Sequence, residues 1–346
     1  MTVTTTLPKA GIIGSGSFGL ALSKLLSINA QVLILMRDPS LAAAINEQHT
    51  LRGVALPKHV KATTSPEQLA QECQTIFPAI PSQYFREMMQ TVGAFLRPRH
   101  YLIHCVKGFD VSAPPATQLG LSRHEIHTMS EVIAEESPVL RIGCLSGPNI
   151  AQEIIDGQPT ATVIASEFSE VIKEGQDLLS SNVFFVFGAH DIIGAEIAGA
   201  LKNIYALGSG YLAGKKLGKN IQSMLITRGL HEIVYFGKAM GAATGSFLGT
   251  AGIGDLIATA TSPDSRNYRF GYRLGQGENL SDVQASFSET AEGVRTLSIA
   301  MQLANHYQIR VPITFMLYKI VYDNFRFEAA LDYLMRYPYA QDVDFI

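Results

Sequence analysis

The most informative polar residue in the sequence is Lys202, which lies in the nearly all-apolar run from Ala198 to Leu207. Burial of an ammonium group costs free energy unless the group is paired. On a helix, the neighbours three and four positions away are mostly small, so this face has room to line a cavity. Desolvation and any nearby cation would lower the lysine pKa towards neutrality. Such a lysine can protonate a carbonyl oxygen and take the proton back in reverse. The alternative is a lysine that snorkels out of a packed helix.

A glycine-rich segment near the N-terminus predicts a nucleotide site. Residues 14–19 read GSGSFG and fit the pattern G-x-G-x-x-G, between an apolar run at Ala10–Ile13 and a helix at Phe18–Leu26. Gly14 permits a tight turn, Gly16 lets the backbone approach a pyrophosphate, and Gly19 lets helix and strand pack closely. The free N–H groups and dipole of the helix N-terminus stabilise the anion. We therefore expect a dinucleotide to bind here.

The two residues after the next strand leave the choice of dinucleotide open. These two residues are Arg37 and Asp38. An acid beside the adenosine ribose favours NAD through the 2′-hydroxyl, whereas an arginine can pair with the 2′-phosphate of NADP. Since Arg37 comes first, the order favours NADP, or use of both. A solvated strand end is the alternative for Arg37.

Four further segments carry groups suited to a small anionic ligand. Arginine offers two parallel donors to phosphate oxygens, asparagine adds amide donors, and glycines allow close approach of the backbone. A surface arginine, a turn aspartate or ordinary loop polarity is the alternative in each case. The segments are Ser265-Arg266-Asn267, Gly252-Ile253-Gly254-Asp255, Lys107-Gly108 and Gly147-Pro148-Asn149.

The first half of the chain alternates short apolar runs with helical stretches, which predicts an α/β fold. Several runs lack polar alternation, as is typical of strands buried on both faces of a parallel sheet. Alternation of β and α predicts a doubly wound Rossmann-type sheet with ligands at the carboxyl ends of its strands. The predicted strands are Ala10–Ile13, Gln31–Met36, Gln74–Ile80, His100–Val106, Leu140–Leu145, Ala161–Ala165 and Val183–Phe187, and helices include Phe18–Leu26 and Gln83–Phe95.

The pattern changes near His190, where strand signals give way to long helical periodicity. We expect residues 1–189 to form the dinucleotide-binding domain and residues 190–346 an all-helical substrate and catalytic domain. Phe247–Gly277 is rich in Gly, Thr, Ser and Asp, which indicates a loop or a broken helix. The predicted helices are Asp191–Leu212, Asn220–Met240, Leu297–His306 and Ile313–Asn324.

Composition excludes several classes of partner. The chain has 346 residues and a net charge of −3, from 27 Lys and Arg against 30 Asp and Glu. That balance argues against nucleic acid or an anionic membrane as the main partner. Three widely spaced cysteines make neither a disulfide framework nor a zinc site and fit a reducing cytoplasm, and no apolar run is long enough to span a membrane. A charged fraction of 16% is low and suggests a large core or an oligomer interface.

Together these segments resemble the NAD(P)-dependent glycerol-3-phosphate dehydrogenases over nearly the whole chain, roughly residues 10–336. The resemblance rests on many short motifs in the same order. Besides the glycine motif they are Ile80-Pro81-Ser82, Val106-Lys107-Gly108, residues 146–151 (SGPNIA), 199–203 (GALKN), 226–230 (ITRGL), 249–255 (GTAGIGD), 265–267 (SRN) and 292–295 (EGVR).

The resemblance implies reversible reduction of dihydroxyacetone phosphate to sn-glycerol 3-phosphate, a precursor of glycerophospholipids, with NAD or NADP as cofactor and no metal. It also implies a homodimer, and it matches Lys202 to the general acid/base of the family. The matching cofactor contacts are Ser17, Phe18, Arg37, Ala151 and Glu292; the positions used by cofactor, substrate or both are Lys107 and Arg266; the substrate positions are Gly147, Asn149, Asp255, Ser265 and Asn267.

The sequence departs from the family pattern at two positions. Asn149 stands where bacterial-type members usually carry Ser or Thr, and its amide can still donate a hydrogen bond. Pro78 falls inside a predicted strand, where proline cannot donate to the ladder, so we expect a local change of backbone there. Two other functions stay open: a dehydrogenase of similar architecture that acts on a 2-keto or 3-hydroxy acid, and a non-catalytic dinucleotide sensor.

Overall fold

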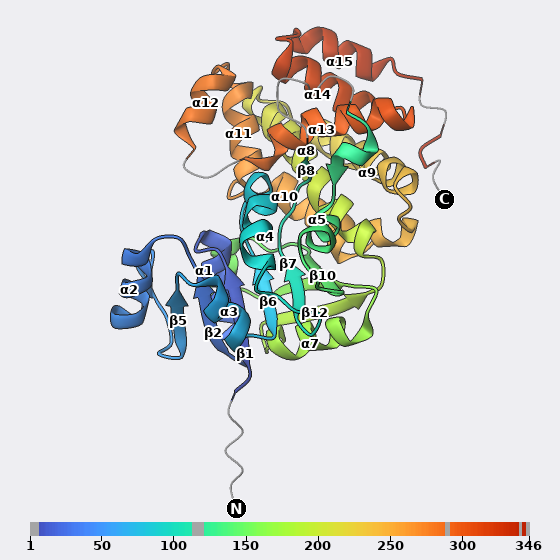
Figure 1. The fold of residues 1–346 in the computed structure, drawn as a ribbon. Helices are drawn as coiled ribbons and strands as arrows, with labels where there is room; N and C mark the ends of the chain where they lie inside the picture. The colour runs from blue at the N-terminus through green and yellow to red at the C-terminus, as the bar shows by residue number, and fades with distance from the viewer. Residues whose placement is uncertain (1–6, 113–120, 288–290, 339–340, 344–346) are drawn as a thin grey trace, which may run out of the picture. The chain divides into compact units, whose positions relative to one another are not determined.

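The computed structural model describes residues 7–112, 121–287, 291–338 and 341–343. Contacts within the chain group its residues into two compact units (Figure 1). The first unit comprises Met1–Val106 and Met129–Ile192, and the second comprises Lys107–Thr128 and Ile193–Ile346. Segment 107–128 therefore belongs with the second unit, although it precedes much of the first unit in sequence. We refer to them as the sheet unit and the helical unit.

The sheet unit is built on one eight-stranded sheet with the order β12-β11-β10-β7-β6-β1-β2-β5. All neighbouring strands run parallel except β10 and β11, which pair antiparallel through Cys144–Ala165 and Ser146–Val163. The parallel Rossmann core is therefore confirmed and extended by two strands of the opposite direction. The strands are β1 (Lys9–Ile13), β2 (Gln31–Leu35), β5 (Val60–Thr63), β6 (Thr75–Pro78), β7 (Tyr101–His104), β10 (Arg141–Ser146), β11 (Thr160–Ala165) and β12 (Phe184–Ala189).

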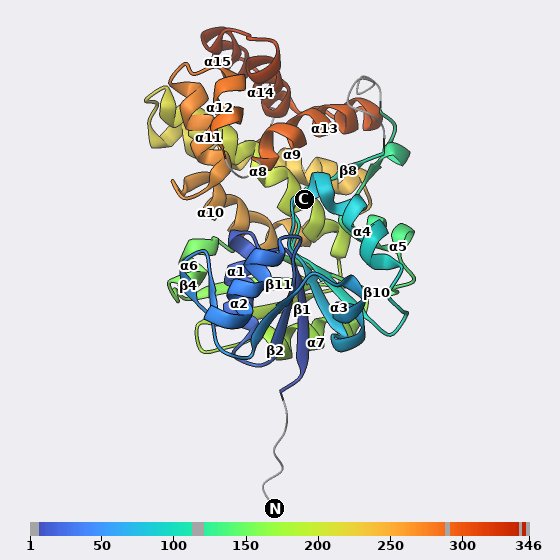
Figure 2. The ribbon, with the colours of Figure 1, turned by 60° about the vertical axis from the view of Figure 1, so that its left-hand side comes forward.

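Helices cover both faces of this sheet, so alternate residues of one strand enter different cores (Figure 2). On β1, Ile12 belongs to the apolar cluster that includes residues of α1, α2 and α7, whereas Ile13 belongs to the cluster that includes residues of α3, α4 and α5. Burial on both faces explains why the central strands read as continuous apolar runs. The helices are α1 (Ser17–Leu26), α2 (Pro39–Gln48), α3 (Pro66–Glu72), α4 (Phe85–Gly93), α5 (Met129–Glu136), α6 (Ala151–Ile155) and α7 (Ser169–Leu179).

All seven predicted strands are present, but the sheet also contains β5, which the sequence reading missed. β5 is an edge strand of four residues, too short for a clear apolar run. Pro78 does not disrupt β6, because it is the last residue of that strand. Pairing continues across it, since Ala79 donates to the Ile13 carbonyl and Cys105 donates to the Pro78 carbonyl. The sheet pairing therefore continues past this proline, and a local change of backbone relative to the family stays a prediction.

The helical unit is organised around α8 (Ile192–Gly214), in which residues 194–212 are all buried. A helix that is apolar on every side must be surrounded by other elements, and here they come from the rest of the unit. This otherwise helical unit also contains two short strands, β8 (Asp110–Val111) and β9 (Ile126–His127), which pair antiparallel. The other long helices are α9 (Lys219–Ala239), α13 (Glu292–Tyr307), α14 (Pro312–Tyr322) and α15 (Phe327–Met335), with α12 (Leu280–Ser286) between them.

The Gly-rich stretch 247–277 is a broken helix rather than a loop. It contains a π-helical turn, η5 (Thr250–Gly254), followed by α10 (Asp255–Thr261) and α11 (Arg266–Gly275). Glycines on α8 and α11 let the two helix backbones touch. A Cβ atom on Gly210 would lie 1.9 Å from the Tyr268 carbonyl oxygen, and one on Gly271 would lie 1.9 Å from that of Leu207. Only glycine is compatible with this packing.

Across the described ranges, no helix combines the length and the hydropathy needed to cross a lipid bilayer. The three cysteines Cys73, Cys105 and Cys144 are buried free thiols. Burial raises the pKa of the Cys73 thiol to about 12, so it is protonated at neutral pH.

A buried carboxyl group on α9 ties three helices of the helical unit together. Glu232 accepts hydrogen bonds from the backbone N–H groups of Ile313 (2.7 Å) and Thr314 (3.0 Å), at the N-terminus of α14. It also accepts from the Thr314 hydroxyl at 2.6 Å and from the Tyr205 hydroxyl of α8 at 3.1 Å. Burial outweighs these four donors and raises the pKa of Glu232 to about 7.

This shift predicts how stability depends on pH. The carboxyl of the unfolded chain has the ordinary pKa of 4.5, and that of the folded protein has a pKa of about 7, so raising the pH across this interval favours unfolding. In Glu232→Gln the amide stays neutral. We expect the free energy of unfolding of the wild type to fall relative to that of the variant between about pH 5 and 7, by on the order of 3 kcal/mol. Denaturant titrations of both proteins across this range measure the difference, and a constant difference would contradict a raised pKa.

Candidate active site

The glycine motif of the sheet unit forms the N-terminus of α1, directly after β1. Gly14 has a φ of +117°, and a Cβ atom there would lie 2.6 Å from the Ala79 carbonyl oxygen. A Cβ atom on Gly19 would lie 2.2 Å from the Gly14 carbonyl oxygen, so the helix packs closely on the turn. A Cβ atom on Gly16, by contrast, would meet no atom within 4 Å. The space over Gly16 is therefore open, as a backbone cradle for a pyrophosphate requires.

Of the other expected cofactor contacts in this unit, Ser17 and Phe18 are the first two residues of α1. Ala151 is the first residue of α6, and it packs with Phe18 against the core on the α1 side of the sheet. The first turn of a helix is where backbone N–H groups and the helix dipole favour an anion.

Structure distinguishes the roles of the two residues after β2. The Asp38 carboxylate caps α2, because its Oδ1 atom accepts from the N–H groups of Ser40 (2.8 Å) and Leu41 (3.3 Å). Arg37 is exposed. The acid is therefore engaged in local structure, which leaves the guanidinium as the group suited to a ligand at this strand end.

The turn after β10 carries two of the predicted substrate positions. Gly147 has a φ of +145°, which strongly favours glycine. Asn149 donates to Thr162 Oγ1 at 2.8 Å, and that hydroxyl donates to the Ser146 carbonyl at 3.1 Å. The Asn149 Oδ1 atom is buried and has no hydrogen-bond partner. An unsatisfied buried oxygen in a turn at the carboxyl end of a strand is typical of a ligand site.

In the helical unit, three charged side chains meet at the N-terminus of α10. Lys202 Nζ lies 2.9 Å from Asp255 Oδ1, and Lys107 Nζ lies 2.7 Å from Asp255 Oδ2. Thr259, one turn along α10, accepts a hydrogen bond from Lys202 and donates to Asp255 Oδ1 at 3.1 Å. Asp255 is 1% exposed and Lys202 is 5% exposed. One buried carboxylate therefore bridges two ammonium groups, and Lys202 does not snorkel to water.

The electrostatics of this cluster set the proton affinity of Lys202. Burial has the largest effect and lowers its pKa to about 8; the Asp255 carboxylate opposes this, and the cations of Lys107 and Arg266 add to it. A lysine with a pKa near the working pH can exist as acid and as base in one reaction cycle. Two lysines and an arginine against a single carboxylate also leave the cluster positive, which suits an anionic ligand.

The segment predicted to hold phosphate forms the N-terminus of α11. Ser265 is the N-cap, and its hydroxyl oxygen accepts from the Tyr268 N–H at 3.3 Å. Arg266 is exposed and is the first helical residue. Asn267 is buried, and its amide donates to Asn203 Oδ1 at 2.9 Å and accepts from the Gly293 N–H at 2.8 Å. A helix N-terminus with an arginine beside it is a suitable phosphate site.

Glu292, the remaining expected cofactor contact, is half-buried and begins α13, one residue before Gly293. The structure therefore collects Lys107, Lys202, Asp255, Arg266, Asn267 and Glu292 within the helical unit. The glycine motif, Arg37, Gly147, Asn149 and Ala151 lie in the sheet unit.

The sequence reading missed two residues of the cluster, Thr259 and Asn203. Thr259 stands four positions after Asp255, the spacing that places both side chains on one helix face, so this interaction could have been recognised. Asn203 donates to the Lys107 carbonyl at 3.3 Å and accepts from Asn267. Asn203 lies in the motif GALKN, but its partners are far apart in sequence, so no local signal could have indicated these two hydrogen bonds.

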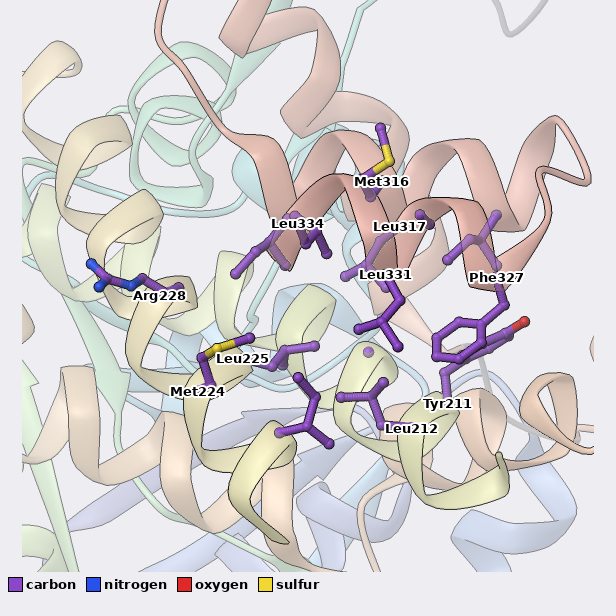
Figure 3. Close-up of a pocket in the computed structure, with 15 residues that line it drawn as sticks. Tyr211, Leu212, Met224, Leu225, Arg228, Met316, Leu317, Phe327, Leu331 and Leu334 are labelled. Atoms are coloured by element: carbon purple, nitrogen blue, oxygen red, sulfur yellow. The ribbon is translucent and has the colours of Figure 1, made fainter. Parts of the chain in front are cut away.

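A separate apolar pocket in the helical unit lacks the groups for this chemistry. It has a volume of about 50 Å³ and lies among α8, α9, α14 and α15 (Figure 3). Its lining is apolar except for Tyr211 and Arg228, and Arg228 donates to the Asp342 carbonyl at 2.9 Å. None of the predicted site residues lines this pocket.

The fold and the lysine cluster define a dinucleotide-dependent dehydrogenase. Residues 9–172 match the family model for the NAD-dependent glycerol-3-phosphate dehydrogenase N-terminus, and residues 191–332 match the one for its C-terminus. The chain therefore belongs to the NAD-dependent glycerol-3-phosphate dehydrogenase family. It is an oxidoreductase of a family that uses NAD or NADP.

Individual relatives agree with this assignment. Glycerol-3-phosphate dehydrogenase [NAD(P)+] from Pseudomonas aeruginosa (strain LESB58) is 39% identical over 340 residues, which cover 97% of this chain and 96% of that protein. The protein of the same name from Alcanivorax borkumensis is 39% identical over 341 residues, with the same coverage. The crystal structure of glycerol-3-phosphate dehydrogenase from Coxiella burnetii matches with a TM-score of 0.85 and 27% identity, over 95% of this chain and 99% of that one. These matches do not support the two other functions that the sequence left open.

The open space over Gly16 makes a prediction about cofactor binding. In Gly16→Ala the added methyl group would enter the space where a pyrophosphate is expected. We expect the Kd for reduced cofactor to rise at least about tenfold, or about 1.4 kcal/mol, as measured by fluorescence titration. The free energy of unfolding should change by less than about 1 kcal/mol, since Gly16 is an extended N-cap with room for a side chain.

Gly218→Ala is the matched control for this variant. Gly218 is also an extended N-cap, that of α9, and a Cβ atom there meets nothing within 4 Å. This control should leave cofactor affinity unchanged. If the two variants bind the cofactor with equal affinity, the pyrophosphate does not approach the backbone at Gly16.

Proposed function

We propose that the chain catalyses the reversible reduction of dihydroxyacetone phosphate to sn-glycerol 3-phosphate. The observation that carries this proposal is the buried Asp255 carboxylate shared by Lys202 and Lys107, within a cluster of net positive charge. A dianionic phosphate ester needs positive charge and fixed donors, and its carbonyl needs an acid with a pKa near neutrality. Family membership and the lysine cluster support the same reaction.

The sheet unit has groups that fit the cofactor. The first turn of α1, with open space over Gly16, would hold the pyrophosphate, and Arg37 would lie at the adenosine ribose. When bound, the reduced nicotinamide supplies the hydride that converts the C2 carbonyl carbon into a secondary alcohol carbon. Because Asp38 caps α2, we propose that NADP is accepted through Arg37 at least as readily as NAD.

Lys202 would move the proton. In the reduction, its Nζ atom gives a proton to the C2 oxygen of the substrate as negative charge develops there. In the oxidation, neutral Lys202 takes the proton back from the C2 hydroxyl. Asp255 and Thr259 hold the Nζ atom in place, and burial keeps its pKa low enough for both directions. Lys107, which is paired with the other oxygen of the Asp255 carboxylate, would orient the substrate.

The N-terminus of α11 would hold the phosphate group. Arg266 offers its guanidinium there, and Asn267 offers the amide N–H that Asn203 does not use. The dipole at this helix N-terminus adds positive potential. On the sheet unit, Gly147 and Asn149 would add contacts to the substrate. Binding energy at the phosphate then orients the reacting carbon.

We also propose a setting for this reaction. A cytoplasmic location fits the three free thiols, and the product would serve as backbone precursor for glycerophospholipids. A homodimer fits the charged fraction of 16% and the exposed side chains of Phe325, Tyr333 and Met335 near and on α15. In this setting the partners are small phosphorylated molecules and a second copy of the chain.

Replacement of Lys202 tests the proton transfer. Lys202→Met keeps the stem but removes the acid, and we expect kcat to fall by about 10²–10⁴ while the Kd of the cofactor stays within about twofold. In the wild type, kcat/KM for reduction should fall as pH rises through about 8, and kcat/KM for oxidation should rise there. Steady-state kinetics in both directions measure these two dependences of kcat/KM on pH. Turnover in Lys202→Met like that of the wild type would refute the role.

Replacement of Arg266 tests recognition of phosphate. In Arg266→Ala we expect kcat/KM for dihydroxyacetone phosphate to fall by about 10–10², because a charge-assisted hydrogen bond of about 1.5–3 kcal/mol is lost. Turnover of dihydroxyacetone, which has no phosphate, should be the same in the variant and in the wild type. Arg269→Ala, at an exposed arginine one turn along α11, is the control. Equal losses with both substrates would exclude a phosphate contact.

A further inference from the structure

Lys107 reaches Asp255 from a segment that is not part of any helix, so the structure must hold that segment in place. Two side chains of the helical core bind its backbone. Asn203 on α8 donates to the Lys107 carbonyl at 3.3 Å, and Arg295 on α13 donates through Nη1 to the Phe109 carbonyl. The Phe109 ring is 1% exposed and packs in the core of the helical unit. The carbonyls on both sides of Gly108 are therefore fastened to helices.

The environment of Arg295 is also unusual for an arginine. It lies one turn after Glu292 on α13, and its charge interacts with the carboxylates of Glu292 and Asp110. Asp110 is itself 6% exposed and directly follows Phe109. Burial lowers the pKa of Arg295, while both carboxylates oppose this shift. Specific hydrogen bonds and ion pairs must offset the free energy that burial of this charged side chain costs.

We propose that Arg295 is a positioning residue for Lys107. Its guanidinium fixes the backbone of residues 107–109 on α13, so that Lys107 Nζ stays on Asp255 and the cluster keeps its positive charge. Arg295 also stands one turn from Glu292, so it connects an expected cofactor contact with the segment that carries Lys107. This inference rests on the proposed function, because it assigns Arg295 a role only through Lys107.

A double-mutant cycle tests the proposal, with wild type, Arg295→Met, Lys107→Met and the double variant. Methionine keeps an apolar stem but has no donor. We expect Arg295→Met to lower kcat/KM for dihydroxyacetone phosphate about tenfold or more in the wild-type background. In the Lys107→Met background the same substitution should change it by less than about twofold, because the side chain that Arg295 positions is already gone.

The pH profile gives a readout that a merely structural role would not move. The charged groups around Lys202 are Asp255, Lys107 and Arg266, and the Lys107 cation contributes to its low pKa. Displacement of Lys107 should therefore raise this pKa. In both Arg295→Met and Lys107→Met, the fall of kcat/KM for reduction should move to higher pH than in the wild type. Arg326→Met, at an exposed arginine before α15, is the control and should change neither kcat/KM nor the profile.

The outcomes separate this inference from the proposed function. Full activity in Lys107→Met would refute the proposed role of Lys107. A loss in Lys107→Met, together with equal factors for Arg295→Met in both backgrounds or an unshifted profile, would overturn the positioning role alone. Circular dichroism and thermal unfolding report whether each variant folds. If Arg295→Met does not fold, Arg295→Lys replaces it in the double-mutant cycle, with the same criteria. Lysine keeps the charge but does not have the reach of the guanidinium.

Discussion

The site depends on one electrostatic constraint, which is that two ammonium groups share one buried carboxylate. Asp255 alone would be costly at 1% exposure, and so would Lys202 at 5%. Together with Lys107 they form a chain of short contacts in which each oxygen of the carboxylate has a cationic partner. Two cations stabilise the Asp255 carboxylate. The Lys107 cation at the same time disfavours a positive charge on Lys202. Burial then lowers the lysine pKa to about 8 without isolating the charge.

This constraint explains features of the helical unit that look unrelated. The chemistry needs α8, α10, α11 and α13 to converge, and small residues make that convergence possible. A Cβ atom on Gly293 would lie 2.6 Å from the Asn203 carbonyl oxygen, and Gly210 and Gly271 bring the backbones of α8 and α11 into contact. Larger residues would push these helices apart by more than a hydrogen bond tolerates. The glycines of this unit therefore serve the polar cluster as much as the apolar core.

Much of the fold and part of the site could be predicted from sequence, because their signals are local. Central strands buried on both faces produce apolar runs, and the glycine motif lies within six residues, so both were found. Lys202 stood out because its neighbours are apolar. β5 was missed because a short edge strand has little apolar pattern, and the direction of β11 has no local signature. That residues 107–128 join the helical unit follows only from long-range contacts, such as those of Phe109 with the core.

The same reasoning explains why Asn203 and Arg295, although they stand in the motifs GALKN and EGVR, receive no role from the sequence while Lys107 does. Lys107 follows a strand and carries a charge at a position where α/β proteins bind ligands, so position alone indicates a function. Asn203 and Arg295 act on the backbone of that segment, and backbone carbonyls leave no trace in a sequence. The residues of a site can therefore be predicted from sequence when their side chains contact the ligand directly. The groups that hold the peptide chain in place become visible only when the hydrogen bonds of each carbonyl are accounted for.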